Sequence, residues 1–126
     1  MQAVILMIED DPASARLMEL MLQSEGYRIV IAPDGVQGLK IAQTDVPDLI
    51  LLDLMLPGED GFEVLRRLRA EPSTADLPVV VVSSKAQAID RQVAADAGAD
   101  AYLTKPYGRV ELLSQIRSLL GEDSAE

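Results

Sequence analysis

The sequence contains no cysteine and no histidine among its 126 residues. Without cysteine there can be no disulfide bond, no thiolate chemistry and no sulfur-ligated metal. Without histidine the chain lacks the usual general base and the commonest transition-metal ligand. Any chemistry that this protein performs must therefore use carboxylates, hydroxyls and lysine.

Basic residues are also scarce. The chain has 11 lysines and arginines against 21 acidic residues, a formal net charge of −10. Such a surface repels phosphate backbones and anionic lipids, so direct binding to nucleic acid or to a membrane is not expected. The first apolar run, residues 3–8 (AVILMI), is too short to span a membrane, and no basic region precedes it. A cytoplasmic protein is predicted.

Short apolar runs alternate with longer amphipathic segments along the whole chain, which is the pattern of βα units around a parallel sheet. The runs LILL and VVVV contain no polar residue, which favours strands covered by helices on both faces. The prediction is a doubly wound, five-stranded parallel sheet with five helices in one domain, residues 1–121, followed by a short acidic tail, residues 122–126. The expected strands cover residues 3–8, 27–32, 48–53, 78–83 and 101–104.

Two helices have clear limits in the sequence. Asp11 followed by Pro12 is typical of a helix cap and a first helical residue. The last helix is predicted to end at Gly121, because an apolar stripe at helical spacing stops there. The stripe consists of Leu112, Leu113, Ile116, Leu119 and Leu120.

The helix expected from about Ala86 to Ala97 is weakly amphipathic. Ile89 and Val93 are its large apolar anchors, and the rest of its stripe is alanine. We therefore expect this helix to be thinly attached and able to shift.

The segment PGEDGF, residues 57–62, is predicted to be scaffold. Asp60 is expected to cap the next helix. The run RRLR, residues 66–69, is expected to form the solvated face of that helix, balanced by Glu63 and Glu71.

Polar residues stand where the predicted strands end. In a doubly wound sheet, ligands bind outside the carboxyl ends of the strands. The strand-end residues are Glu9 and Asp10, Asp53, Ser83 and Lys105. Each alone could be an ordinary solvated loop residue, but together they would bring three acids, a hydroxyl and an ammonium group to one edge of the sheet.

Three carboxylates at one edge raise each other's pKa and repel, unless a cation joins them. Lys105 supplies a single positive charge, so a divalent ion is the natural partner. Oxygen ligands without histidine or cysteine favour Mg²⁺, or alternatively Mn²⁺. An aspartate that lies beside such an ion, a lysine and a hydroxyl has the groups needed for phosphoryl transfer. Asp53 is therefore the predicted acceptor.

Four segments carry a family resemblance: ILMIEDDP, LILLDLMLPGEDGFEVL, PVVVVSS and AYLTKPY. They resemble, in order and spacing, the signature segments of the response-regulator receiver domain of two-component signalling, and they span nearly the whole chain. The resemblance implies a flavodoxin-like strand order, 2-1-3-4-5. It also implies that Asp53 is phosphorylated, that Asp10 binds Mg²⁺ directly and Glu9 through water, and that the backbone carbonyl of Met55 is a further metal ligand.

The same resemblance implies the switch residues. Ser83 occupies the position of the switch hydroxyl and Tyr102 that of the switch aromatic, although Tyr102 could also be an ordinary half-buried strand residue. Lys105 matches the family lysine, and the bond to Pro106 is expected to be cis. Ser84 departs from the small alanine that is more usual in the family.

The predicted function is therefore a phosphoryl-accepting switch that assists its own phosphorylation and dephosphorylation, rather than an enzyme. The expected donor is a sensor histidine kinase or a histidine phosphotransfer protein. The expected recipient of the signal is a downstream protein or an output domain outside this chain, and a phosphorylation-linked dimer is a further expectation.

Two alternatives stay open at this point. A phosphohydrolase of the haloacid dehalogenase type would also use an aspartate nucleophile, but it needs a second aspartate where this chain has Met55. The other alternative is an interaction module that works without phosphorylation.

Overall fold

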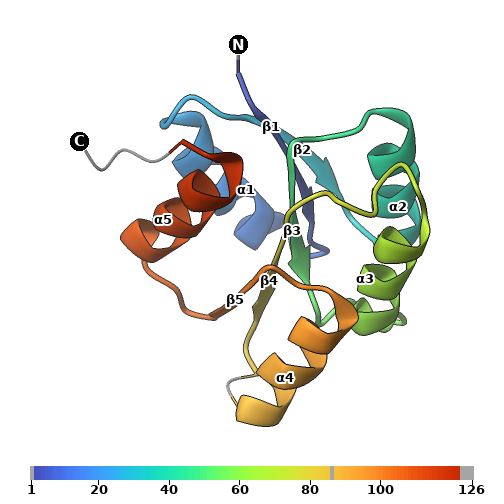
Figure 1. Cartoon of the computed structure of the whole chain (residues 1–126). Helices are drawn as coiled ribbons and strands as arrows, with labels where there is room; N and C mark the ends of the chain where they lie inside the picture. The colour runs from blue at the N-terminus through green and yellow to red at the C-terminus, as the bar shows by residue number, and fades with distance from the viewer. Residues whose placement is uncertain (1, 86, 123–126) are drawn as a thin grey trace.

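The computed structural model describes residues 2–85 and 87–122. Its centre is a five-stranded parallel sheet of order β2-β1-β3-β4-β5 (Figure 1). This is the predicted doubly wound, flavodoxin-like arrangement, and each strand lies within one residue of its predicted limits. The strands are β1 (Val4–Ile8), β2 (Arg28–Ala32), β3 (Leu49–Asp53), β4 (Val79–Ser83) and β5 (Ala101–Thr104).

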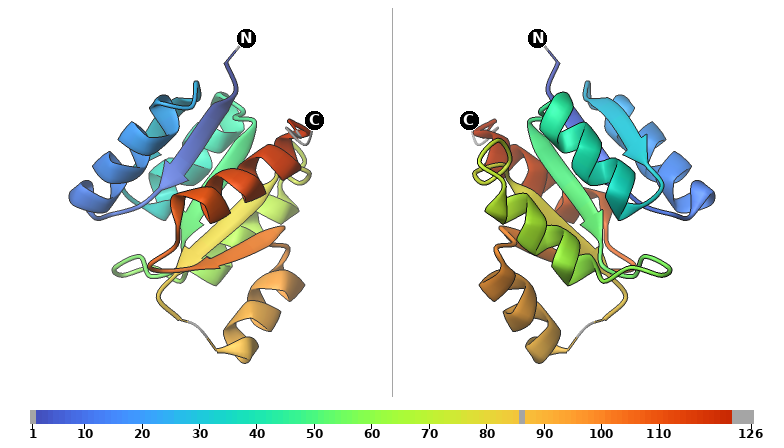
Figure 2. Two further views of the ribbon diagram at one scale, coloured as in Figure 1. Left: turned by 90° about the vertical axis from the view of Figure 1, so that its left-hand side faces the viewer. Right: turned by 90° about the vertical axis from the view of Figure 1, so that its right-hand side faces the viewer.

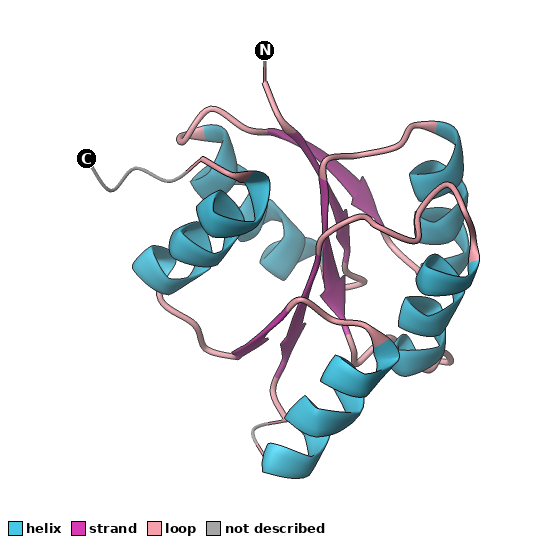
Figure 3. Cartoon of the chain, viewed as in Figure 1, coloured by secondary structure: helices cyan, strands magenta, loops and turns pink. Residues whose placement is uncertain are grey.

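Helices alternate with the strands and cover both faces of the sheet (Figures 2 and 3). One face packs against α1 and α5, and the other packs against α2 and α3. In the described part of the chain, no helix has the length and apolar character needed to cross a membrane. The helices are α1 (Pro12–Gln23), α2 (Gly35–Thr44), α3 (Gly61–Ala70), α4 (Ala88–Ala97) and α5 (Arg109–Leu120).

The central strands are buried on both sides because successive side chains point to opposite faces. In β1, Ile5 and Met7 face α1 and α5, whereas Leu6 and Ile8 face α2 and α3. All five residues of β3 and of β4 are buried. The purely apolar runs in the sequence therefore mark strands that are sandwiched between two helical layers.

The predicted helix caps are confirmed. The Asp11 side chain accepts hydrogen bonds from the backbone N–H and the hydroxyl of Ser14, and α1 begins at the following proline. Asp60 accepts from the N–H of Phe62 at the start of α3. Gly121 ends α5 with a φ of +74°, a left-handed conformation that glycine adopts without strain.

Helix α4 is thinly attached, as predicted, but one predicted anchor is wrong. Ala94 is its buried residue, whereas Ile89 is 62% exposed. Ile89 precedes Ala94 by five residues, which turns it about 140° around the helix, so the two side chains cannot face the sheet together. The helix begins at Ala88, and Ala86 lies outside the described residues.

Arg69 also differs from the prediction. The first two arginines of RRLR are exposed and pair with Glu63 at 3.4 Å, as expected. The Arg69 guanidinium instead turns inward and donates to the carbonyl of Gly98, to the carboxylate of Asp100 at 2.9 Å, and to two carbonyls of the loop before β4. It therefore ties the end of α3 to the end of α4.

The chain beyond α5 is described as far as Glu122, so residues 123–126 of the predicted tail lie outside the described part. The Glu122 carboxylate accepts a hydrogen bond from the Tyr27 hydroxyl at 2.8 Å. Burial, and then the hydrogen bond to Glu122, raises the pKa of Tyr27 to about 12.

Candidate functional site

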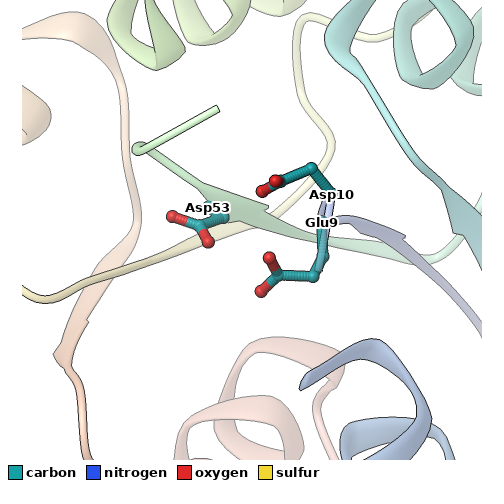
Figure 4. A group of neighbouring side chains, drawn as sticks. All are labelled: Glu9, Asp10 and Asp53. Carbon is teal, nitrogen blue, oxygen red and sulfur yellow. The ribbon is translucent and has the colours of Figure 1, made fainter. Parts of the chain in front are cut away.

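Three carboxylates meet at the carboxyl edge of the sheet (Figure 4). Oxygen atoms of Glu9, Asp10 and Asp53 lie within 4.8 Å of one another. β1 and β3 are neighbours with Ile8 beside Leu52, so the residues that follow in each strand come side by side. Glu9 is 3% exposed and Asp53 is 4% exposed, whereas Asp10 lies nearer the solvent.

Lys105 supplies the positive charge of the cluster. Its Nζ lies 2.8 Å from Oδ2 of Asp53 and 3.2 Å from Oε1 of Glu9. The other oxygens of these acids accept backbone hydrogen bonds: Oδ1 of Asp53 from Met55 at 2.8 Å, and Oε2 of Glu9 from Asp11 at 3.2 Å. Both buried carboxylates are thus held in fixed orientations.

The position of Lys105 follows from its strand. It comes directly after β5, and its backbone N–H donates to the carbonyl of Ser83 at 2.8 Å. The peptide bond to Pro106 is cis, as the family resemblance implied. The side chain therefore starts from a fixed point on the sheet edge and reaches the acids of β1 and β3.

Burial and neighbouring charges perturb the ionisation of two groups. Burial raises the pKa of the Glu9 carboxyl, and the charge of Asp53 adds to this; the Asp11 N–H and Lys105 act in the opposite direction. For Lys105, burial lowers the pKa, but hydrogen bonds and charges from Asp53 and Glu9 outweigh it, so the pKa is raised. The lysine therefore stays charged, yet one ammonium faces three acids.

The donor set fits a hard divalent cation. All three side chains offer carboxylate oxygens, which are the ligands that Mg²⁺ and Mn²⁺ prefer. The two buried acids carry more negative charge than Lys105 balances, so a divalent ion would relieve their repulsion. The predicted convergence of Glu9, Asp10, Asp53 and Lys105 is confirmed as geometry.

Ser83 and Tyr102 are linked to each other through the loop that follows β4. Ser83 is fully buried, and its hydroxyl oxygen accepts a hydrogen bond from the Lys85 N–H at 3.1 Å. The carbonyl of the same residue, Lys85, accepts from the Tyr102 hydroxyl at 2.8 Å. Tyr102 is half-buried on β5 and lies outside the acidic cluster. The sequence could not predict this link between Ser83 and Tyr102, because the N–H and the carbonyl of Lys85 that form it are backbone groups.

Arg91 of α4 holds the outer side of Tyr102. Its guanidinium carbon lies 5.0 Å from the centre of the tyrosine ring, and its Nη2 donates to the Thr104 hydroxyl at 2.6 Å. The first contact is a cation–π interaction. Arg91 therefore attaches α4 to β5 near the site.

A doubly wound sheet of this strand order, with a lysine and an acidic cluster at its carboxyl edge, defines the flavodoxin-like receiver class. The chain belongs to the response regulator receiver domain family, whose model matches residues 5–117. It is thus a receiver domain of two-component signal transduction. This assignment favours the phosphoryl-accepting switch over the phosphohydrolase alternative.

The relatives agree with this assignment. The DNA-binding dual master transcriptional regulator RpaA of Synechocystis sp. is 47% identical over 116 residues, which are 92% of this chain and 48% of that protein. The chain thus spans about half the length of this relative.

Two solved structures are similar over almost the whole chain. The receiver domain of the sensor histidine kinase PA1611 from Pseudomonas aeruginosa, with a magnesium ion coordinated in its active site cleft, has a TM-score of 0.88 and 34% identity, covering 96% of this chain and 99% of that one. The BeF3-activated N-terminal receiver domain of RstA from Klebsiella pneumoniae has a TM-score of 0.86 and 31% identity, covering 93% and 97%.

Proposed function

We propose that Asp53 accepts a phosphoryl group from a histidine kinase or a histidine phosphotransfer protein, in a Mg²⁺-dependent reaction that switches a partner-binding surface. The observation that carries this proposal is the environment of Asp53: a buried strand-end carboxylate held between Lys105 and two further acids. With neither histidine nor cysteine in the chain, a carboxylate is the natural covalent acceptor.

The side chain of Asp53 is oriented for attack. The Met55 N–H binds one carboxylate oxygen and Lys105 binds the other, so the group does not need to be positioned at the moment of reaction. A carboxylate oxygen forms a bond to phosphorus as the phosphorus–nitrogen bond of the donor breaks, and the electron pair leaves on the imidazole nitrogen. The ammonium group of Lys105 then neutralises charge on the phosphoryl oxygens.

The acids hold the metal in this proposal. Glu9, Asp10, Asp53 and the backbone carbonyl of Met55 would bind Mg²⁺, and Mn²⁺ offers the same preference for oxygen ligands. When bound, the ion supplies positive charge that offsets the carboxylates and the incoming phosphoryl oxygens. The magnesium ion in the cleft of the PA1611 receiver domain supports this assignment.

The switch follows from the hydrogen bonds around Lys85. If the Ser83 hydroxyl turns to a phosphoryl oxygen, the Lys85 N–H loses its acceptor, and the same peptide segment holds the Tyr102 hydroxyl. The loop and Tyr102 then rearrange together, because a ligand shifts a two-state element through differential contacts. The surface expected to change comprises α4, β5 and α5. The BeF3-activated form of the RstA receiver domain supports an activated state for a domain of this fold.

The recipient of the signal in this proposal is a downstream protein or an output domain. The partial coverage of RpaA supports the second of these. A phosphorylation-linked dimer is a further form that the switched state could take.

Mass spectrometry after incubation with acetyl phosphate and Mg²⁺ tests the chemistry. The parent protein should gain one base-labile phosphoryl group, and Asp53→Asn should gain none. Asp76→Asn, which makes the same change at an exposed loop residue, should be labelled like the parent. If Asp53→Asn were labelled as fully as the parent, the assignment of Asp53 as acceptor would be wrong.

A further inference from the structure

We infer that Glu59 is a positioning residue for the metal site, because it anchors the loop that carries the Met55 carbonyl; this inference rests on the proposed function. The loop runs from Leu54 to Asp60 and connects β3 to α3. Its first residues follow the acceptor, Asp53, so its conformation decides where the carbonyl of Met55 lies.

Glu59 reaches across from this loop to the start of α2. Both of its carboxylate oxygens lie within hydrogen-bond distance of the Gly35 N–H, at 2.9 and 2.7 Å. A negative charge is favourable at a helix N-terminus. α2 already has its own cap, since the Asp34 side chain accepts from the N–H of Gln37 at 2.8 Å. The contact to Glu59 is therefore additional, and its second effect is to tie the loop to α2.

The start of α2 is shaped to receive the carboxylate. A Cβ atom at Gly35 would lie 2.5 Å from Oε2 of Glu59 and 2.7 Å from Cγ2 of Val64, both far closer than van der Waals contact. Gly35 does not have a positive φ, so its backbone conformation does not require glycine. The missing side chain instead provides the space in which Glu59 approaches the backbone.

The loop is only partly buried: Leu54 and Leu56 are each 5% exposed and pack in the core on the side of α2 and α3. Met55 is 50% exposed, and Gly58 turns the chain with a φ of +70°. At the start of α3, Gly61 packs directly on the loop, since a Cβ there would lie 2.5 Å from the Cα of Leu54. Glu59 lies between the exposed turn at Gly58 and α3, where its contact to α2 adds to the hold that the two leucines provide.

Loss of the Glu59 contact should lower the fraction of molecules in which the metal ligands are assembled. The apparent dissociation constant of a ligand rises in inverse proportion to that fraction. A charge-assisted hydrogen bond is strong enough for Glu59→Ala to weaken Mg²⁺ binding about fivefold. Glu59→Gln keeps an acceptor oxygen but loses the charge, so an intermediate effect is expected.

Isothermal titration calorimetry with MgCl₂, without a phosphoryl donor, measures this effect. The matched control is Glu63→Gln, which removes the same charge from an exposed residue in the first turn of α3. The inference expects Glu63→Gln to bind Mg²⁺ like the parent. Equal weakening by Glu59→Ala and Glu63→Gln would overturn it in favour of general electrostatics. An unchanged dissociation constant with a lowered melting temperature would overturn it in favour of a purely structural role.

A second measurement needs no variant. Coupling between two sites is reciprocal, so Mg²⁺ must strengthen the contact that assists its binding. Saturating Mg²⁺ should therefore slow hydrogen exchange of the Gly35 amide in the parent, measured by NMR, by about fivefold. If the parent binds Mg²⁺ without slowing this amide, the role of Glu59 is refuted while the metal site stands. If the parent binds no Mg²⁺, both the metal site and the inference fail.

Discussion

Replacing Asp53 by asparagine is expected to raise the melting temperature of the metal-free protein. Without a cation, the Asp53 charge lies close to the charges of Glu9 and Asp10, and among the described residues Lys105 is the positive group that pairs with Asp53. Asparagine keeps the shape of the side chain and removes the charge. Its amide can still accept from the Met55 N–H.

The structure sets the size of this effect. At an effective dielectric constant of about 20, two like charges 4.8 Å apart repel by about 3.5 kcal/mol. Asp53 faces two such charges, whereas Lys105 at 2.8 Å attracts it by about 6 kcal/mol. Solvent screens the charge of Asp10, and desolvation of the Asp53 carboxylate acts in the opposite direction. The expected gain is therefore about 1 kcal/mol, or a rise of about 4 °C in melting temperature.

Thermal unfolding in EDTA, followed by far-ultraviolet circular dichroism, measures this gain; the chain has no tryptophan to serve as a fluorescent probe. Asp76→Asn controls for the change in net charge. Mg²⁺ at ten times its dissociation constant should stabilise the parent by about 1.4 kcal/mol, and should stabilise Asp10→Asn less. If Asp53→Asn melts below the parent in EDTA and Mg²⁺ shifts neither melting temperature, the acidic cluster is an ordinary set of polar strand-end residues and not a metal site.

Three further predictions concern other parts of the fold. The pKa of Tyr27 is raised to about 12 from 10.0, so the neutral phenol stabilises the fold below pH 10 and this stabilisation is lost as the pH rises above 10. Chemical unfolding should show that the unfolding free energy falls by about 1 kcal/mol between pH 9 and 11. An equal fall in Tyr27→Phe would contradict this. Gly61→Ala should lower the unfolding free energy by about 2 kcal/mol, because its Cβ would overlap backbone atoms, whereas Gly108→Ala, with open space around its Cβ, should not; similar values for the two would refute the packing argument. Arg91→Ala should release α4 from Tyr102, so amide exchange in α4 should accelerate about tenfold, and unchanged exchange would show that this contact does not hold the helix.

Much of the fold was predictable because apolar runs and polar strand ends coincide. The unbroken apolar residues of β3 and β4 predicted strands that are buried on both faces, and the structure confirms them within one residue. Asp11 and Gly121 predicted helix ends because capping is a local property of the chain.

The site was predictable for a similar reason, since parallel strands bring their carboxyl ends to one edge. The structure confirms that Glu9, Asp10, Asp53 and Lys105 meet there. The acceptor role of Asp53 followed from its neighbours, whereas the separate metal-binding roles of Glu9 and Asp10 came from the family resemblance; all of these roles stay predictions.

The contacts that could not be predicted are those made with backbone atoms of distant segments. Arg69 binds the carbonyl of Gly98, 29 residues away, and Glu59 binds the N–H of Gly35, 24 residues away. Every residue offers the same backbone groups, so composition gives no hint of which one is chosen. Ile89 was misjudged because the helical face that meets the sheet depends on tertiary packing rather than on the pattern within a thinly apolar helix.

The two ends of α4 are attached differently, so the helix can pivot about its carboxyl end. Its carboxyl end is held through the backbone, where Arg69 donates to the carbonyl of Gly98. Near the amino end Gln87 provides no side-chain cap, and the attachment there is the Arg91 side chain. Ten residues make a rod about 15 Å long, so a pivot of about 10° around Gly98 would displace the amino end by about 2.6 Å and leave the carboxyl end almost still. A partner that senses this motion should therefore contact the amino-terminal half of α4, where a given rotation produces the longest stroke.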